Sequence, residues 1–571
     1  MAARMICLLP VCLLLVLAFA TQCPAASATV ISLAGQWRFD LDPNNTGISE
    51  KWFDKDLSEN GRLPGSTDSN QKGTRNDRKP DMQRLSRLYE YTGAAWYQRE
   101  ITIPKEWKGK HVSLFLERCH WETRVWLDGN PVGMQDSLCI PHMYDLGVVE
   151  PGMHRLTIRV DNTIKYDIGG WAHAITEETQ TNWNGIVGRI ELRATPLVSV
   201  EDVQVYPNVK AKSIRVKALV RSEKKQPTWL ALCVYERGTS KLVQKTVIKS
   251  DGFAGEKTFE TVMSIPNAKL WDEFSPNLYQ IQVAAAARDN SFDRCDAVFG
   301  MREIAVRDKR IEVNGRKVFF RGTLECCIFP RTGYPPTDID SWLRIFRICK
   351  SYGLNSMRFH SWCPPEAAFA AADKMGFMLH VEAPHWAHNV GKDKPRDEYM
   401  RLETQRILDT YGNHPSFCLM VLGNELLPDV DYLQESVMIC QKYDPRRLYS
   451  ASTAYVPGPH NDFFVGLGRG LHGDSTDKDF RDEIEKSSCP VLGHEIGQWA
   501  VLPNLAEIPK YNGVLRARNF ELLRDNLRAH NLLDQAAAFT EASGKLSVAL
   551  YKEEIEVLMR TPGHSGFELL D

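Results

Sequence analysis

The chain has 571 residues, which is too long for one hydrophobic core and predicts roughly two to four domains. Its composition, with 43% hydrophobic and 25% charged residues, is typical of a globular protein. The 70 basic and 72 acidic side chains give a formal net charge of −2, so the sequence indicates no nucleic acid and no membrane surface as a partner.

Residues 1–28 have the pattern of a secretory signal peptide. Arg4 precedes an apolar stretch, and small residues follow it before the expected cleavage point. We therefore expect a secreted or periplasmic protein, with a lipid anchor on Cys23 as the less favoured alternative. The rest of the chain has no apolar stretch of the about 18 residues that a transmembrane segment needs.

Between residue 31 and about residue 305, short segments alternate apolar and polar residues and are separated by turn residues. Alternation with period two and frequent turns is typical of β-sandwiches. The stretch is too long for one sandwich, so we place a boundary near residue 196. We expect a jelly-roll domain at 29–196 and an immunoglobulin-like β-sandwich at 197–305.

From 306 to 571 the pattern changes to apolar strands that alternate with helix-like segments. The strand candidates are 317–322, 354–359, 377–382, 417–422, 447–452, 462–466, 490–494 and 566–570. Eight such strands with helices between them predict a (β/α)8 TIM barrel. Because the chain ends inside the eighth candidate strand, we expect a barrel that is truncated at its last strand and exposes a strand edge there.

Two glutamates stand where barrel strands are predicted to end. Asn424 and Glu425 follow the apolar segment SFCLMVLG, and Glu495 ends the seventh candidate strand. Catalytic side chains of such barrels lie at the C-terminal ends of the strands. Strands four and seven face each other across a barrel, so the two carboxylates can approach one bond. Two opposed carboxylates are what glycoside hydrolysis needs.

Other polar and aromatic residues near predicted strand ends are candidates for substrate binding. They are Arg358, His360, Glu382, His385, Trp386 and Trp499. Aromatic side chains at a barrel opening can stack on sugar faces, while ordinary packing is the alternative for each residue. His385 and His388 have a spacing that could ligate a metal, but no third ligand is near, so we expect no metal and no cofactor.

The chain resembles glycoside hydrolase family two, which includes β-galactosidases, β-glucuronidases and β-mannosidases. The segments LAGQWRFDLDP and WNGIVGRIEL are similar to its sugar-binding jelly roll, and HPSFCLMVLGNE and GHEIG to its barrel. The resemblance covers nearly everything after the leader. It implies a retaining, exo-acting mechanism in which Glu425 is the acid/base, Glu495 is the nucleophile and Asn424 binds the sugar 2-hydroxyl.

The resemblance leaves the sugar open. Family β-galactosidases and β-glucuronidases carry SHYP soon after the arginine of strand two, whereas this chain has RFHSWCPP. We expect a β-galactosidase first, with β-glucuronidase, β-mannosidase or α-L-arabinopyranosidase as alternatives. A rival from another class is a carbohydrate-binding protein with an inactive barrel. Homo-oligomerisation is left open.

Overall fold

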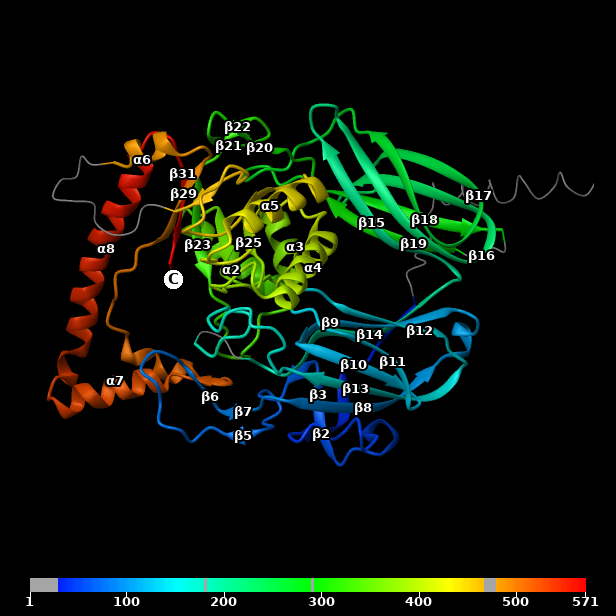
Figure 1. The fold of residues 1–571 in the computed structure, drawn as a ribbon, viewed down its shortest axis with the longest axis horizontal. Coiled ribbons are helices and arrows are strands. Elements are labelled where there is room, and N and C mark those ends of the chain that lie inside the picture. The colour runs from blue at the N-terminus through cyan, green and yellow to red at the C-terminus, as the bar shows by residue number, and fades with distance from the viewer. Residues whose placement is uncertain (1–28, 179–181, 289–291, 467–478, 571) are drawn as a thin grey trace, which may run out of the picture.

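The computed structural model describes residues 29–178, 182–288, 292–466 and 479–570 (Figure 1). The predicted leader, residues 1–28, lies outside the described residues. Figure 1 shows a central barrel with one β-sandwich below it and another at its upper right. No helix among the described residues has both the length and the apolar character needed to cross a membrane.

The first sandwich consists of two antiparallel sheets that enclose an apolar core. One sheet has the order β1 (Thr29–Ser32), β14 (Gly185–Thr195), β9 (His111–His120), β12 (His142–Val148), with β4 (Gly65–Ser66) paired to β14. The other has the order β11 (Asn130–Gln135), β10 (Glu122–Leu127), β13 (Gly152–Asp161), β8 (Ala94–Ile103), β2 (Gly35–Asp42), β3 (Glu59–Leu63). The alternating apolar residues of these strands point into the space between the sheets.

The second sandwich is built around two very long strands. Its strands are β15 (Val198–Asn208), β16 (Ser213–Glu236), β17 (Leu242–Ser264), β18 (Tyr279–Ala287) and β19 (Phe292–Phe299). The first half of β16 pairs with β15 and its second half pairs with β18. The register of β16 against β17 shifts between Ser222 and Thr228, which is where both long strands pass from one layer to the other.

The barrel confirms all eight strand candidates in position and order. Its strands are β23 (Phe320–Glu325), β24 (Ser356–Phe359), β25 (Met378–Glu382), β26 (Phe417–Val421), β27 (Leu448–Ser450), β28 (Phe464–Val465), β29 (Val491–Ile496) and β31 (His564–Leu569). Their pairings are parallel throughout. The continuous burial of β24, β25, β26 and β29 explains why these strands are apolar runs and do not alternate.

The open edge of the barrel is not at the eighth strand, where the sequence placed it. Strand β31 pairs with both β23 and β29, because its six residues are enough to bond a neighbour on each side. The seam lies between β27 and β28, where Thr453 and Val465 form an isolated bridge. Strand β28 has only two residues and is too short to form a ladder with β27.

Helices cover the outside of the barrel. They are α2 (Ile339–Ser351), α3 (Glu366–Met375), α4 (Lys394–Tyr411), α5 (Val430–Tyr443) and α6 (Arg481–Lys486). The side chains of Asp338, Asp393 and Asp429 cap α2, α4 and α5 by accepting backbone N–H groups of the first turn. These caps fix where each helix begins after its strand.

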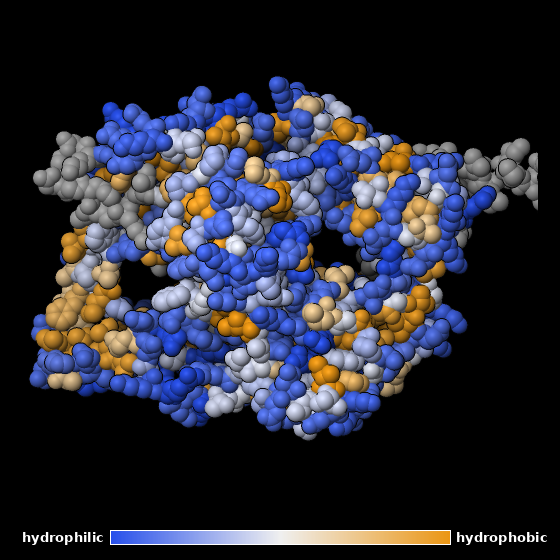
Figure 2. Space-filling view, in the orientation of Figure 1, coloured by the Kyte–Doolittle hydropathy of each residue, from blue (hydrophilic) through white to orange (hydrophobic). Residues whose placement is uncertain are grey.

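Between β29 and β31 the chain leaves the barrel through α7 (Arg518–Ala529) and α8 (Ala536–Arg560). The short strand β30 (Leu515–Arg516) of this excursion pairs with β6 (Ser86–Arg87) of the first sandwich. Figure 2 shows apolar and weakly polar residues gathered along α7 and α8, and Leu546 and Val548 of α8 are exposed. The sequence analysis did not anticipate this excursion.

Candidate active site

Glu425 and Glu495 lie at the C-terminal ends of facing barrel strands. Glu425 follows β26, and Glu495 is the penultimate residue of β29. Both have a left-handed backbone, with φ of 44° at Glu425 and 49° at Glu495. This conformation is uncommon for residues with a side chain and is concentrated at functional sites. The same strained geometry therefore occurs on both sides of the barrel opening.

The two carboxylates approach each other closely. One carboxylate oxygen of Glu425, one of Glu495 and a ring nitrogen of His494 all lie within 4.8 Å of one another. Retaining glycosidases have carboxyl groups about 5–5.5 Å apart, whereas inverting enzymes separate them by about 6.5–9.5 Å to admit a water molecule. The spacing of this pair fits the retaining arrangement.

The same three side chains could in principle ligate a metal ion. However, His494 Nε2 lies 3.3 Å from Glu495 Oε1, within reach of a direct interaction with the carboxylate. Among the described residues, no further His, Cys, Asp or Glu joins this group of three possible ligands.

Cationic and hydrogen-bonding groups surround the Glu495 carboxylate. Its Oε1 lies 3.0 Å from His360 Nε2 and 3.6 Å from Arg358 Nη1. Burial alone would raise the pKa of Glu495, but hydrogen bonds from His360 and His494 and the charge of Arg358 outweigh it and hold that pKa far below its usual value. Glu495 is therefore ionised at neutral pH.

Arg358 is fully buried and joins several strand ends. Its Nε donates to Glu382 Oε1 at 2.6 Å, its Nη1 to Glu568 Oε2 at 3.4 Å and its Nη2 to Asn424 Oδ1 at 2.6 Å. Burial alone would lower the pKa of this guanidinium. The charges of the surrounding glutamates raise it by more than burial lowers it, so Arg358 stays positively charged. The predicted residues Arg358, Glu382 and Asn424 thus belong to one network.

Asn424 is completely buried between this network and the opening. Its backbone N–H donates to the His385 carbonyl at 2.9 Å, and its side-chain oxygen accepts from Arg358 and, at 2.6 Å, from the Thr453 hydroxyl. Its Nδ2 has no hydrogen-bond partner within the described part of the chain. A buried amide donor without a partner is costly, so this N–H is a candidate to bind a ligand.

Several residues of the site were missed by the sequence analysis, among them Thr453 and His380. Glu568 of β31 accepts from Arg358 and lies 2.6 Å from His380 Nδ1, and His494 directly precedes Glu495. Burial raises the pKa of Glu568, but the charges of His380 and Arg358 lower it overall. A glutamate near the end of the eighth apolar run was a signal that could have been used, as was the histidine beside Glu495.

Another missed residue, His173, comes from the first sandwich. Its ring stacks on that of His360 with centroids 4.3 Å apart, and its backbone N–H donates to the Ser361 hydroxyl at 2.7 Å. Burial and the nearby His360 lower its pKa well below the usual value, so the ring is neutral. No pattern in the sequence connects the segment between β13 and β14 to the barrel.

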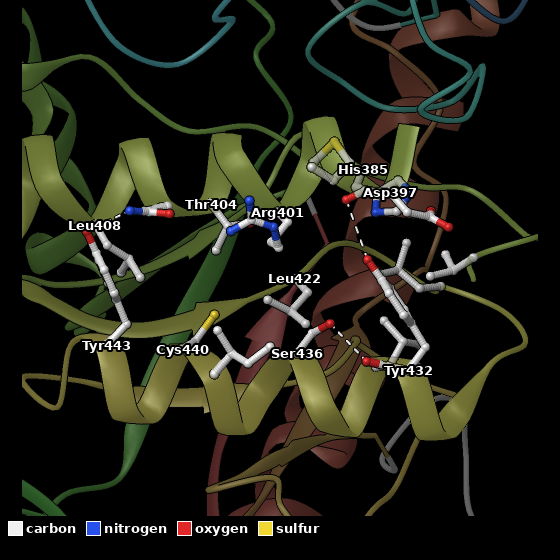
Figure 3. Close-up of a pocket in the computed structure, with 16 residues that line it drawn as sticks. His385, Asp397, Arg401, Thr404, Leu408, Leu422, Tyr432, Ser436, Cys440 and Tyr443 are labelled. Carbon is white, nitrogen blue, oxygen red and sulfur yellow. Dashed lines mark hydrogen bonds between the residues drawn. The ribbon is translucent and has the colours of Figure 1, made fainter. Parts of the chain in front are cut away.

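The remaining predicted residues occupy different surroundings. Trp386 is half-buried with its ring centroid 4.9 Å from that of His360, whereas the Trp499 indole donates to Glu554 of α8 at 2.8 Å. Burial lowers the pKa of His385 to about 3, and this residue lines a cavity between α4 and α5 of about 70 Å³ (Figure 3). His388 is exposed.

Comparisons with known proteins identify the two sandwiches. Residues 30–196 match the family description "Glycosyl hydrolases family 2, sugar binding domain", and residues 198–302 match "Glycosyl hydrolases family 2". A β-glucuronidase of Paenibacillus borealis is 22% identical over 453 residues, which cover 73% of this chain and 71% of that protein. A β-galactosidase of Oenococcus oeni is 22% identical over 425 residues, covering 70% of this chain and 40% of that protein.

Solved structures share the fold of most of the chain. A β-glucuronidase from Ruminococcus gnavus in complex with D-glucuronic acid superposes with a TM-score of 0.71 at 18% identity, covering 96% of this chain and 91% of that one. A β-galacturonidase from Eisenbergiella tayi bound to galacturonate gives 0.70 at 18% identity, covering 95% and 90%. The chain spans 63% of the mouse β-glucuronidase, which is 22% identical over 441 residues and matches 69% of this chain.

The Arg358 network generates a stability prediction. Arg358→Leu should lower the free energy of unfolding by about 3–5 kcal/mol, because it leaves Glu382 and Glu568 buried without their cation. Arg401→Leu, which removes a solvent-exposed ion pair with Glu398, should cost much less, because water and salt screen such a pair. Denaturant titration followed by circular dichroism measures the free energy of unfolding of both variants. Equal decreases in the two variants would contradict the claim that the Arg358 network stabilises the fold more than an exposed ion pair does.

Proposed function

Because the chain belongs to glycoside hydrolase family 2, we propose that it is a retaining β-glycosidase whose active site is the opening between Glu425 and Glu495. The observation that carries the proposal is the distance of no more than 4.8 Å between carboxylate oxygens of these residues. A pair this close has no room for the water that an inverting enzyme places between sugar and base.

The first step forms a covalent intermediate. The ionised Glu495 carboxylate attacks the anomeric carbon, and Glu425 donates its proton to the glycosidic oxygen, so that the leaving group departs as a neutral alcohol. In the second step Glu425 removes a proton from water, and the resulting hydroxide displaces Glu495 from the sugar. Both carboxyl groups return to their starting states, and the sugar keeps its anomeric configuration.

The surrounding residues support these roles. Arg358 and His360 stabilise the negative charge of Glu495 until it attacks, and Arg358 also fixes the Asn424 amide. The unpartnered Asn424 N–H is suited to the sugar 2-hydroxyl, a contact that strengthens in the transition state. Attack on terminal sugars is part of the proposal and follows the resemblance to the family.

For the sugar, we place a β-glucuronide first and a β-galactoside second. Several of the relatives and the fold neighbours bear the name β-glucuronidase, one neighbour is a β-galacturonidase and one relative is a β-galactosidase. This reverses the order expected from sequence, in which β-galactosidase came first. A carbohydrate-binding protein with an inactive barrel is the alternative that turnover would exclude.

Hydrolysis of aryl glycosides tests the proposal directly. We expect turnover of one sugar among β-glucuronide, β-galactoside, β-galacturonide, β-mannoside and α-L-arabinopyranoside. Glu495→Gln should lower kcat by at least about 10³-fold, because the amide cannot act as the nucleophile. Glu485→Gln, at an exposed position of α6, is the matched control and should leave the rate unchanged. Activity that survives Glu495→Gln would contradict the assignment.

The pH profile tests the environment of Glu495. His360→Ala removes a hydrogen bond that lowers the pKa of Glu495, so the carboxylate should become protonated at a higher pH. The acid limb of kcat/KM, measured between about pH 3 and pH 8, should therefore move to higher pH. His388→Ala, which changes an exposed histidine, should leave the limb in place. An unmoved limb in His360→Ala would show that His360 does not control this group.

A further inference from the structure

Three aromatic side chains lead from the Glu495 carboxylate to the surface, and we refer to His360, Trp386 and Trp171 as the aromatic wall. His360 Nε2 lies 3.0 Å from Glu495 Oε1, and its ring centroid is 4.9 Å from that of Trp386. The Trp386 centroid is 6.3 Å from that of Trp171. The wall ends in solvent, because Trp171 is 63% exposed.

The aromatic wall is assembled from two domains. His360 and Trp386 follow the barrel strands β24 and β25, whereas Trp171 belongs to the segment between β13 and β14 of the first sandwich. The inner part of the wall also contacts the neutral ring of His173, which lies 6.0 Å from Trp386 and stacks on His360. The rings nearest the barrel opening therefore come from both sides of the domain boundary.

The segment that carries Trp171 is tightly seated on the barrel. The backbone N–H of Trp386 donates to the backbone carbonyl of Ile168 at 2.7 Å. Gly169 has φ +94°, and a Cβ there would lie 2.1 Å from the Trp386 carbonyl oxygen, so no other residue fits this close approach. A Cβ on the adjacent Gly170 would meet open space. The position of Trp171 beside Trp386 is therefore set by backbone packing.

The length of the aromatic wall separates its outer end from the sugar being cleaved. That sugar must place its anomeric carbon against Glu495, next to His360. Centroid distances of 4.9 Å from His360 to Trp386 and 6.3 Å from Trp386 to Trp171 place Trp171 at the end of the wall away from Glu495, on the side open to a leaving group. Tryptophan with an exposed ring is suited to stacking on flat apolar faces at a wet surface.

We propose that Trp171 and Trp386 form a stacking subsite for the leaving group of the glycoside. The inference rests on the proposed function and deepens it. The subsite takes a leaving group with a flat apolar face, which is either a second pyranose ring or an aromatic ring. The first sandwich thereby contributes directly to substrate selection through Trp171.

The test compares leaving groups on the same sugar. The substrates are a disaccharide, a 4-nitrophenyl glycoside and the glycosyl fluoride, whose leaving group has no ring. Trp171→Ala should lower kcat/KM about tenfold for ring-bearing leaving groups and leave the fluoride unchanged. A loss with the disaccharide alone identifies a sugar as the natural occupant, and a loss with the aryl glycoside alone identifies an aromatic group. Either result supports the subsite.

Matched variants separate stacking from structural damage. Tyr352→Ala removes an aromatic ring that is 81% exposed at the end of α2, and it should leave kcat/KM unchanged for every substrate. Gly169→Ala should reproduce the selective loss of Trp171→Ala, because it displaces the seated segment, whereas Gly170→Ala should not. Trp171→Phe should retain most of the wild-type preference.

Two results would overturn the inference: unchanged kinetics in Trp171→Ala, or an equal loss with the glycosyl fluoride. If the wild-type protein hydrolyses none of the substrates, the proposed function fails on its own. Isothermal titration calorimetry of the wild type and Trp171→Ala with the disaccharide and the 4-nitrophenyl glycoside then tests the subsite by affinity, independently of turnover. Weaker binding by Trp171→Ala would support it, and equal affinity or no binding by the wild type would overturn it.

Discussion

The site depends on the ion pairs and hydrogen bonds that the buried guanidinium of Arg358 makes with its neighbours. A guanidinium with no exposed surface is stable only if its neighbours compensate it, and here Glu382, Asn424, Glu495 and Glu568 do so. These partners come from β25, β29, β31 and the loop after β26, where Asn424 is the third residue past the strand. One cation therefore links four strand ends and helps to keep Glu495 ionised.

The same network gives the two glutamates different properties. Glu495 is buried, ionised and held by His360, whereas Glu425 is only half-buried and is linked through its backbone N–H to the Thr453 hydroxyl. A retaining mechanism needs such a division, since one carboxyl group must be charged and the other must exchange protons with solvent. The strained backbone at both residues is what the network has to hold in place.

Sequence reasoning found what is local and missed what depends on tertiary contact. The barrel strands were predictable because buried parallel strands are continuous apolar runs, and Glu425 and Glu495 were predictable because they interrupt such runs. The partnership of Glu568 with Arg358 joins the second and eighth strands, and the stacking of His173 on His360 joins two domains. Neither contact has a periodic signature. The domain boundaries and the catalytic roles remain predictions.

The most direct test of the account is the stereochemistry of hydrolysis. Proton NMR of the reaction mixture, recorded before mutarotation equilibrates the product, identifies the first anomer that is released. Because carboxylate oxygens of Glu425 and Glu495 lie within 4.8 Å, the account predicts that a β-glycoside first yields the β-anomer. Release of the α-anomer first would show single displacement by water and would contradict the assignment of Glu495 as a covalent nucleophile.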